Sequence, residues 1–170
     1  MDVLGELAAV VHHPDLMIAE LAGDSKIPAI KQLIDRLHEQ QIVDDNLAFL
    51  QAVLERESLQ STVIGDGEVA LPHARGRMVR RLGLALGRTR VPISYPSGDD
   101  RHEVSLICLI AVPADSPGLY LKLLAALARV FDEAAFRTEL GEADTAERMQ
   151  QLLARKIEMS CSIPPYPYRS

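Results

Sequence analysis

Cysteine is scarce in this sequence, and a disulfide framework is excluded. The 170 residues include two cysteines, Cys108 within an apolar run and Cys161 near the carboxyl end. Neither belongs to a Cys-x-x-Cys pair or to a Cys/His pattern with the spacing of a metal site. A reducing, cytoplasmic environment is therefore the simplest prediction.

Long apolar runs and an excess of positive charge are also missing. The longest apolar stretch, residues 104–114, is well short of the ~20 residues needed to span a bilayer, and no charged-then-apolar signal sequence opens the chain. We therefore expect no membrane insertion. Eighteen basic against 24 acidic residues give a net charge of −6, which argues against nonspecific binding of nucleic acid but permits contact with a basic protein.

Metal and nucleotide motifs are absent as well. His12 and His13 are neighbours, but adjacent side chains diverge on a helix or a strand, and no further ligand follows at a suitable spacing. We interpret them as a surface pair and expect no metal and no cofactor. A metal hydrolase is disfavoured because no carboxylate–histidine spacing occurs, and no Gly-x-x-x-x-Gly-Lys-Ser/Thr loop indicates a nucleotide site.

What the sequence does contain is an alternation of apolar strands and amphipathic helices. The periodicities predict helices at 1–11, 24–41, 44–57, 119–131, 133–140 and after Asp144, and strands at 16–21, 69–71, 79–87 and 104–112. Residues 92–101 are predicted to form an exposed loop around a short segment. In the helix at 44–57 the predicted buried stripe is Leu47, Leu50, Val53 and Leu54.

These elements predict one α/β domain, a mixed sheet of about five strands with helices on both faces. A hydrophobic content of 48% over 170 residues is sufficient for one substantial core. We place the domain at residues 1–159. The proline-rich tail at 160–170 is expected to be extended or disordered unless it docks on the domain or a neighbour.

A single histidine stands out in the run Ile-Gly-Asp-Gly-Glu-Val-Ala-Leu-Pro-His-Ala-Arg at residues 64–75. Two glycines predict a tight turn, a short β-prone run follows, and Pro72 is expected to end it at His73. Proline fixes its own φ and keeps the preceding residue extended, so the imidazole leaves in a defined direction. Arg56 and Thr62 upstream, with Arg75 just beyond, indicate a phosphate environment.

This region resembles the phosphorylation motif of enzyme IIA domains of the fructose–mannitol class of the bacterial phosphotransferase system, which includes the nitrogen-regulatory IIA proteins. The matching pieces are Arg56-Glu57, Ser61-Thr62, Ile64-Gly65-Asp66-Gly67 and Ala70-Leu71-Pro72-His73. The resemblance extends from roughly the first predicted helix to about residue 157. It implies the same fold and a chain that carries phosphate on a histidine.

The resemblance also implies roles for the residues around the motif. His73 is the expected nucleophile, Arg56 the expected charge stabiliser and Thr62 a hydroxyl donor, with Arg75 a further candidate cation. Structural alternatives are a histidine that serves only packing and an arginine that only complements its helix dipole.

Two departures from the family pattern affect the expected activity. Transport members have a second histidine at the start of the helix after the central strand, where this chain has Tyr120. A tyrosine hydroxyl donates a hydrogen bond but gains no charge near neutral pH, so we expect slower transfer. Glu68 looks like one extra residue in the turn, and we expect its carboxylate to point outward.

The implied phosphoryl donor is the histidine phosphocarrier protein rather than ATP. The implied targets are a IIB domain, a kinase or a transcriptional regulator. The alternative hypothesis is a regulatory interaction module that keeps the IIA fold without being phosphorylated; the missing second histidine and the extra Glu68 favour it, whereas His73, Arg56 and Thr62 together oppose it.

Overall fold

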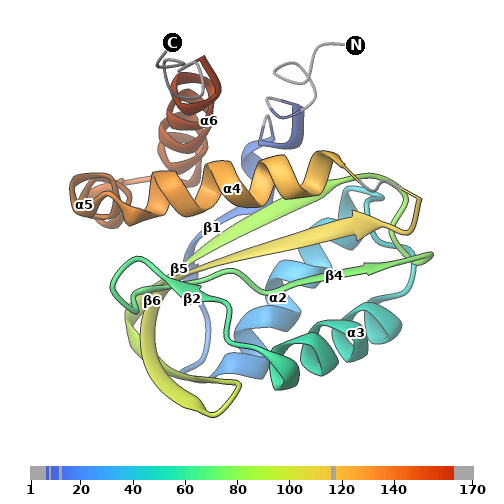
Figure 1. Ribbon diagram of the computed structural model, residues 1–170. Coiled ribbons are helices and arrows are strands. Elements are labelled where there is room, and N and C mark those ends of the chain that lie inside the picture. The colour runs from blue at the N-terminus through green and yellow to red at the C-terminus, as the bar shows by residue number, and fades with distance from the viewer. Residues whose placement is uncertain (1–6, 8, 12, 116–117, 163–170) are drawn as a thin grey trace, which may run out of the picture.

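The computed structural model describes residues 7, 9–11, 13–115 and 118–162. They form a mixed sheet between two layers of helices (Figure 1). In chain order the elements are η1 (Pro14–Leu16), β1 (Met17–Leu21), α2 (Lys26–Glu39), α3 (Asn46–Leu59), β2 (Val63–Ile64), β3 (Val69–Ala70), β4 (His73–Gly76), β5 (Gly83–Ser97), β6 (Asp100–Pro113), α4 (Leu119–Asp132), α5 (Ala134–Glu142) and α6 (Ala146–Ser162). The predicted α/β class is confirmed, with six strands among the described residues in place of about five.

Strand β6 is the centre of the sheet. The described strands lie in the order β1-β5-β6-β3-β2, and β4 also pairs with β6. β5 runs antiparallel to β6, whereas β3 and β4 run parallel to it. Residues 106–113 of β6 are buried on both faces, as the apolar run at 104–112 predicts.

Helices cover both faces of the sheet. α2 and α3 pack on one face and α4, α5 and α6 on the other (Figure 1). The helix predicted after Asp144 is α6, whose Met149, Leu153 and Ile157 are fully buried against the sheet while Leu152 is partly buried.

The stripe predicted for α3 is wrong at Leu47, which is 75% exposed. The buried positions are Phe49, Val53 and Glu57, spaced by four residues along the helix. This spacing places them on one helix face, but its last member is a glutamate. The apolar residues alone therefore do not show which face of α3 packs on the sheet, because a glutamate belongs to that face.

The loop predicted around residues 93–95 is wrong, because this segment belongs to a long hairpin. β5 and β6 remain paired out to Ser97 and Asp100, at the tip. Pro92 falls in the register shift between Arg88 and Ile93. β1 pairs with β5 only as far as Thr89, so a missing N–H costs little in the outer half of β5, where proline is tolerated.

β3 ends at Ala70, before Pro72, as predicted, but a further strand that the sequence did not predict, β4, begins at His73. β3 pairs with β6 at residues 106–107, and β4 resumes the pairing at Ile110. The carbonyl of Pro72 accepts a hydrogen bond from the Ile110 amide at 3.0 Å. Proline lacks a donor but keeps its acceptor, so His73 enters the sheet with backbone pairing on both sides of Pro72.

The carboxyl-terminal helix is longer than predicted. α6 continues to Ser162, so residues 160–162 are helical and not part of an extended tail. The helix ends two residues before Pro164, and a proline disfavours helical geometry in the residue before it. Residues 163–170 and most of the helix predicted at 1–11 lie outside the described residues. In the part of the chain that the structure describes, no helix is long and apolar enough to cross a membrane.

Gly83 and Gly87 in β5 leave room for the larger side chains of Ile42 and Leu21. A Cβ atom at Gly87 would lie 2.6 Å from Cδ1 of Leu21 on β1. We therefore expect Gly87→Ala to destabilise the fold by about 1–3 kcal/mol through overpacking, measured by urea denaturation.

The matched control is Gly141→Ala in α5, where an added Cβ meets nothing within 4 Å. This change is expected to be neutral or to stabilise by about 0.4–1 kcal/mol, because alanine restricts the unfolded chain. Equal effects at the two glycines would contradict the close contact between β1 and β5.

Candidate functional site

His73 lies in a hollow of about 460 Å³ where α3, β4 and α4 meet. Three of the four predicted site residues, His73, Arg56 and Tyr120, line this hollow. The other lining residues are Ala52, Glu55, Leu59, Ala74, Arg75, Val112, Leu121 and Leu124. The hollow therefore combines one imidazole, two guanidinium groups, one carboxylate and an apolar wall.

The imidazole of His73 is half-buried and held by its own strand end. Its Nδ1 atom lies 3.0 Å from the carbonyl oxygen of Leu71. A carbonyl only accepts hydrogen bonds, so this contact assigns the proton to Nδ1. Nε2 then keeps its lone pair.

Arg56 contacts the other ring nitrogen. It occupies the last turn of α3, and its Nε lies 3.5 Å from Nε2 of His73. An arginine N–H only donates, so the contact requires a lone pair on Nε2 and agrees with the assigned tautomer. The predicted pairing of a cation with the candidate nucleophile is present in the geometry.

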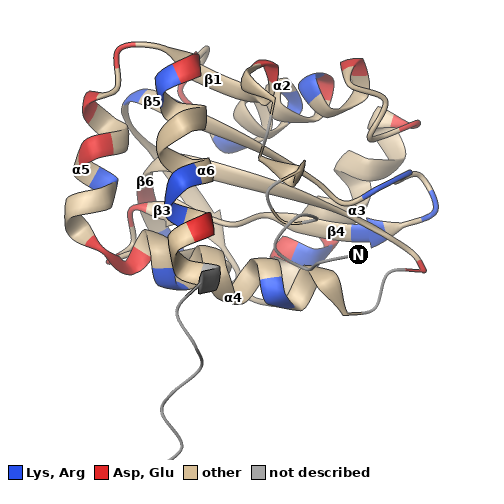
Figure 2. Cartoon of the chain, turned by 90° about the horizontal axis from the view of Figure 1, so that it is seen from above, with Lys and Arg blue, Asp and Glu red and all other residues tan. Residues whose placement is uncertain are grey.

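Arg75 and Tyr120 form a second pair in the hollow. Nε and Nη2 of Arg75 donate to the carbonyl of Ala114 at 3.1 and 2.7 Å, and its guanidinium carbon lies 5.9 Å from the Tyr120 ring centroid. Tyr120 is the second residue of α4. Arg75 lies on β4, and Arg77, Arg80 and Arg81 lie in the loop that follows this strand. This part of the molecule is therefore basic, although the chain as a whole is acidic (Figure 2).

Thr62 does not line the hollow. Its hydroxyl donates to Oε1 of Glu57 at 2.7 Å, and the residues around His73 do not include it. A direct contact between Thr62 and a phosphoryl group stays a prediction.

Glu57 belongs to the matching motif piece Arg56-Glu57, but the sequence predicted no role for it. Its side chain is 2% exposed, and its carboxylate accepts from four groups. Tyr95 and Ser97 donate at 2.9 and 2.7 Å; the Thr62 hydroxyl and the Lys26 ammonium, the latter at 3.3 Å, are the other two donors. Burial and the nearby carboxylate raise the pKa of the Tyr95 hydroxyl, which therefore stays a donor.

Glu68 is neutralised away from the hollow, which agrees with its expected outward direction. Its Oε2 accepts from Nε of Arg137, on α5, at 2.7 Å. Nη2 of the same arginine reaches Asp66 at 3.1 Å. Gly65, at φ +60°, begins this turn, and a Cβ there would lie 2.8 Å from the Phe131 carbonyl oxygen. The turn is thus fastened to the α4–α5 junction.

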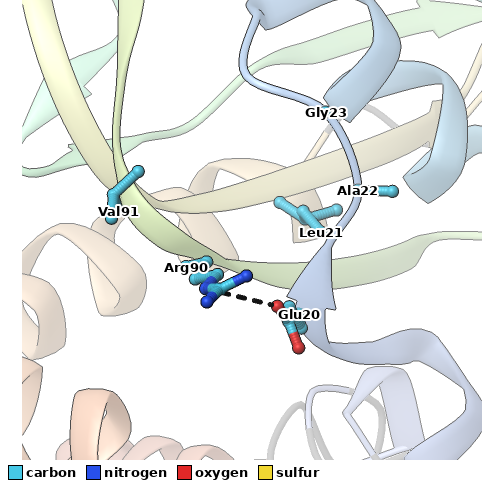
Figure 3. A pocket seen from close by; sticks show the side chains of 6 residues that line it. All are labelled: Glu20, Leu21, Ala22, Gly23, Arg90 and Val91. Atoms are coloured by element: carbon cyan, nitrogen blue, oxygen red, sulfur yellow. Dashed lines mark ion pairs between the residues drawn. The ribbon is translucent and has the colours of Figure 1, made fainter.

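A second hollow, of about 350 Å³, lies beside β1 and β5 (Figure 3). The described residues that line it carry no imidazole, thiol or hydroxyl; Glu20 and Arg90 face each other at 4.0 Å. Cys108 is also unsuited to nucleophilic chemistry, since burial raises the pKa of its thiol. The described residues contain no cluster of three side chains that would hold a metal ion. His13 is half-exposed, and His12 lies outside the described residues.

Comparison with known proteins identifies the family. The family model for the phosphoenolpyruvate-dependent sugar phosphotransferase system, EIIA 2, matches residues 11–156. The chain is 33% identical over 144 residues to the PTS system fructose-specific EIIA component of Haloferax volcanii, covering 85% of this chain and 92% of that protein. It spans 22% and 21% of the length of two further curated relatives, both EIIABC components.

Solved structures share the fold. The nitrogen regulatory protein IIA-Ntr from Neisseria meningitidis superimposes with a TM-score of 0.74 at 28% identity, covering 83% of this chain and 94% of that one. Enzyme IIA mannitol from Escherichia coli, solved in complex with phosphorylated enzyme IIB mannitol, gives 0.66 at 19% identity, with 83% and 95% covered. With the match over residues 11–156, these findings show that the chain belongs to the EIIA type 2 family of the phosphotransferase system.

Proposed function

We propose that the chain accepts a phosphoryl group on Nε2 of His73 from the histidine phosphocarrier protein. It then passes the group on or signals through its phosphorylation state, in the cytoplasm. The observation that carries this proposal is the pair of contacts on one ring, Leu71 on Nδ1 and Arg56 on Nε2. Together they leave a lone pair on the nitrogen that Arg56 faces.

The proposed transfer forms a bond between Nε2 and phosphorus while the nitrogen–phosphorus bond of the donor breaks. The proton stays on Nδ1, in its hydrogen bond to the Leu71 carbonyl, and this contact stabilises the positive charge that the ring acquires. Arg56 supplies positive charge to the phosphoryl oxygens, where most of the transition-state charge resides. Arg75 is a second cation on the hollow, and Glu55 is the one acidic side chain among the described residues that line it.

The rim of the hollow suits a protein as the exchange partner. Leu59 and Leu121, on opposite helices, line it and are 78% and 55% exposed. Exposed apolar side chains beside a reactive group favour a protein surface over a small, charged substrate. A IIB domain, a kinase or a transcriptional regulator are the proposed targets; the relatives include both sugar-specific components and nitrogen regulatory proteins.

Intact mass measures the central claim. After incubation with phosphoenolpyruvate, enzyme I and the histidine phosphocarrier protein, we expect the chain to gain one phosphate and His73→Ala to gain none. Loss of the donor protein from the mixture should abolish the gain. No gain by the unaltered, folded chain would instead support the interaction module that keeps the fold without phosphorylation.

Arg56→Ala should slow the transfer, because a preorganised donor to developing charge is removed; we expect about a 100-fold decrease in rate, measured by rapid quench. Arg90→Ala removes an exposed guanidinium from the second hollow and is the matched control. Equal rates for the two variants would show that positive charge in general, and not Arg56, supports the reaction.

Tyr120→His should restore a charged donor beside His73. Relative to the unaltered chain we expect about tenfold faster transfer below pH ~6.5, where an imidazole is protonated. The advantage should fade as the pH rises to 8, since the added ring then loses its proton. Tyr120→Phe is the comparison variant, and a rate ratio that does not change with pH would argue against electrostatic help from this position.

A further inference from the structure

Glu57 follows Arg56 directly in the last turn of α3, but the two side chains point to different surroundings. Arg56 is exposed and faces His73, whereas Glu57 is buried against the end of β5. Successive side chains on a helix are about 100° apart. The contacts that hold the side chain of Glu57 therefore also fix the direction in which Arg56 points.

The contacts of Glu57 join the end of α3 to three other segments of the chain. Lys26 is the first residue of α2, and Tyr95 and Ser97 lie at the end of β5. Thr62 immediately precedes β2, and the backbone carbonyl of Glu57 accepts from the Gly98 amide at 3.0 Å. The end of α3 has Gln60, in extended geometry, as its C-cap and no glycine. These contacts are what holds the last turn in place.

A second path leads from the same carboxylate to the other side of the histidine. The Thr62 hydroxyl donates to Glu57, and the Thr62 carbonyl accepts from the Leu71 amide at 3.0 Å. The Leu71 carbonyl in turn accepts from Nδ1 of His73. Both groups that contact the imidazole, one on each ring nitrogen, are thus connected to Glu57.

We propose that Glu57 is a positioning residue for phosphoryl transfer: it holds Arg56 against Nε2 and, through Thr62 and Leu71, holds the proton on Nδ1. The inference rests on the proposed function of His73. In this arrangement Thr62 acts behind the site, through its hydroxyl on Glu57 and its backbone carbonyl on Leu71. Glu57 itself touches neither the imidazole nor the transferred group.

Glu57→Gln is the sharpest test, because it preserves the shape of the side chain. The amide offers one acceptor oxygen where the carboxylate offers two, and in either orientation it removes the negative charge that faces the Lys26 ammonium. A small displacement of a group that positions a reaction slows it by up to about 100-fold. We expect slower transfer by rapid quench and, in ¹⁵N spectra of the unphosphorylated His73 ring, a smaller share of the Nδ1–H tautomer.

Asp45→Ala is the matched control for lost stability. Asp45 caps the opposite end of the same helix, where its carboxylate accepts from the Ala48 amide at 3.0 Å. The variant should lower the melting temperature without changing the tautomer signals or the transfer rate. In an Arg56→Ala background, Glu57→Gln should slow transfer by a smaller factor, since one of its two routes to the ring is already absent.

Ser97→Ala covers the case in which Glu57→Gln does not fold. It removes one donor and keeps the carboxylate, and we expect a smaller change of the same sign in both readouts. The inference would be overturned if folded Glu57→Gln showed unaltered ring signals and an unaltered transfer rate. If Glu57→Gln does not fold, the same result for Ser97→Ala would overturn it. If the unaltered chain accepts no phosphate, the proposed function fails, and the ring signals alone then decide whether Glu57 sets the tautomer.

Discussion

The rest of the site depends on one buried carboxylate. A charge removed from water is expensive unless it is paired and fully hydrogen-bonded, and Glu57 meets this requirement with a lysine, a tyrosine, a serine and a threonine. Such a network is highly directional: its partners have to arrive from α2, from the end of β5 and from the start of β2. Because the buried carboxylate of Glu57 needs these hydrogen bonds, the segments that supply them meet at the end of α3, beside the histidine.

The second constraint is the pairing along β6. Because β3 and β4 share this strand, Leu71 and Pro72 form a short interruption between two paired segments. A proline in an uninterrupted central strand would leave an acceptor without its donor. Here the interruption turns the Leu71 carbonyl toward the ring of His73 and leaves the Pro72 carbonyl bonded to β6. The break in the pairing with β6 at Leu71 and Pro72 thus also orients the imidazole.

The two sides of the hollow differ in how they are held. Arg56 is positioned by a buried ionic network, whereas Tyr120 and Arg75 meet in a looser cation–aromatic contact at 5.9 Å. An arginine over a partly exposed aromatic ring stabilises the fold by about 0.5–1 kcal/mol. Removing one partner of a buried ion pair destabilises the fold by far more than this. In the proposed function, the α4 side is therefore the adaptable one. This asymmetry suits a regulator whose output is read by contact at the exposed rim.

The sequence by itself determined the α/β class, the central strand, the amphipathic helices and a histidine accompanied by Arg56. These follow from local periodicity, turn residues and the resemblance of one motif, which are properties of neighbouring positions. Only the tertiary structure decided that Glu57 is buried, that Thr62 bonds to it, and that residues 93–97 pair in a hairpin. The partners of Glu57 include Lys26, Tyr95 and Ser97, which lie 31, 38 and 40 positions away along the chain. A glutamate at a helix end is typical of a solvated surface. No local sequence pattern reveals its hydrogen-bond donors, because only the folded chain brings them to it.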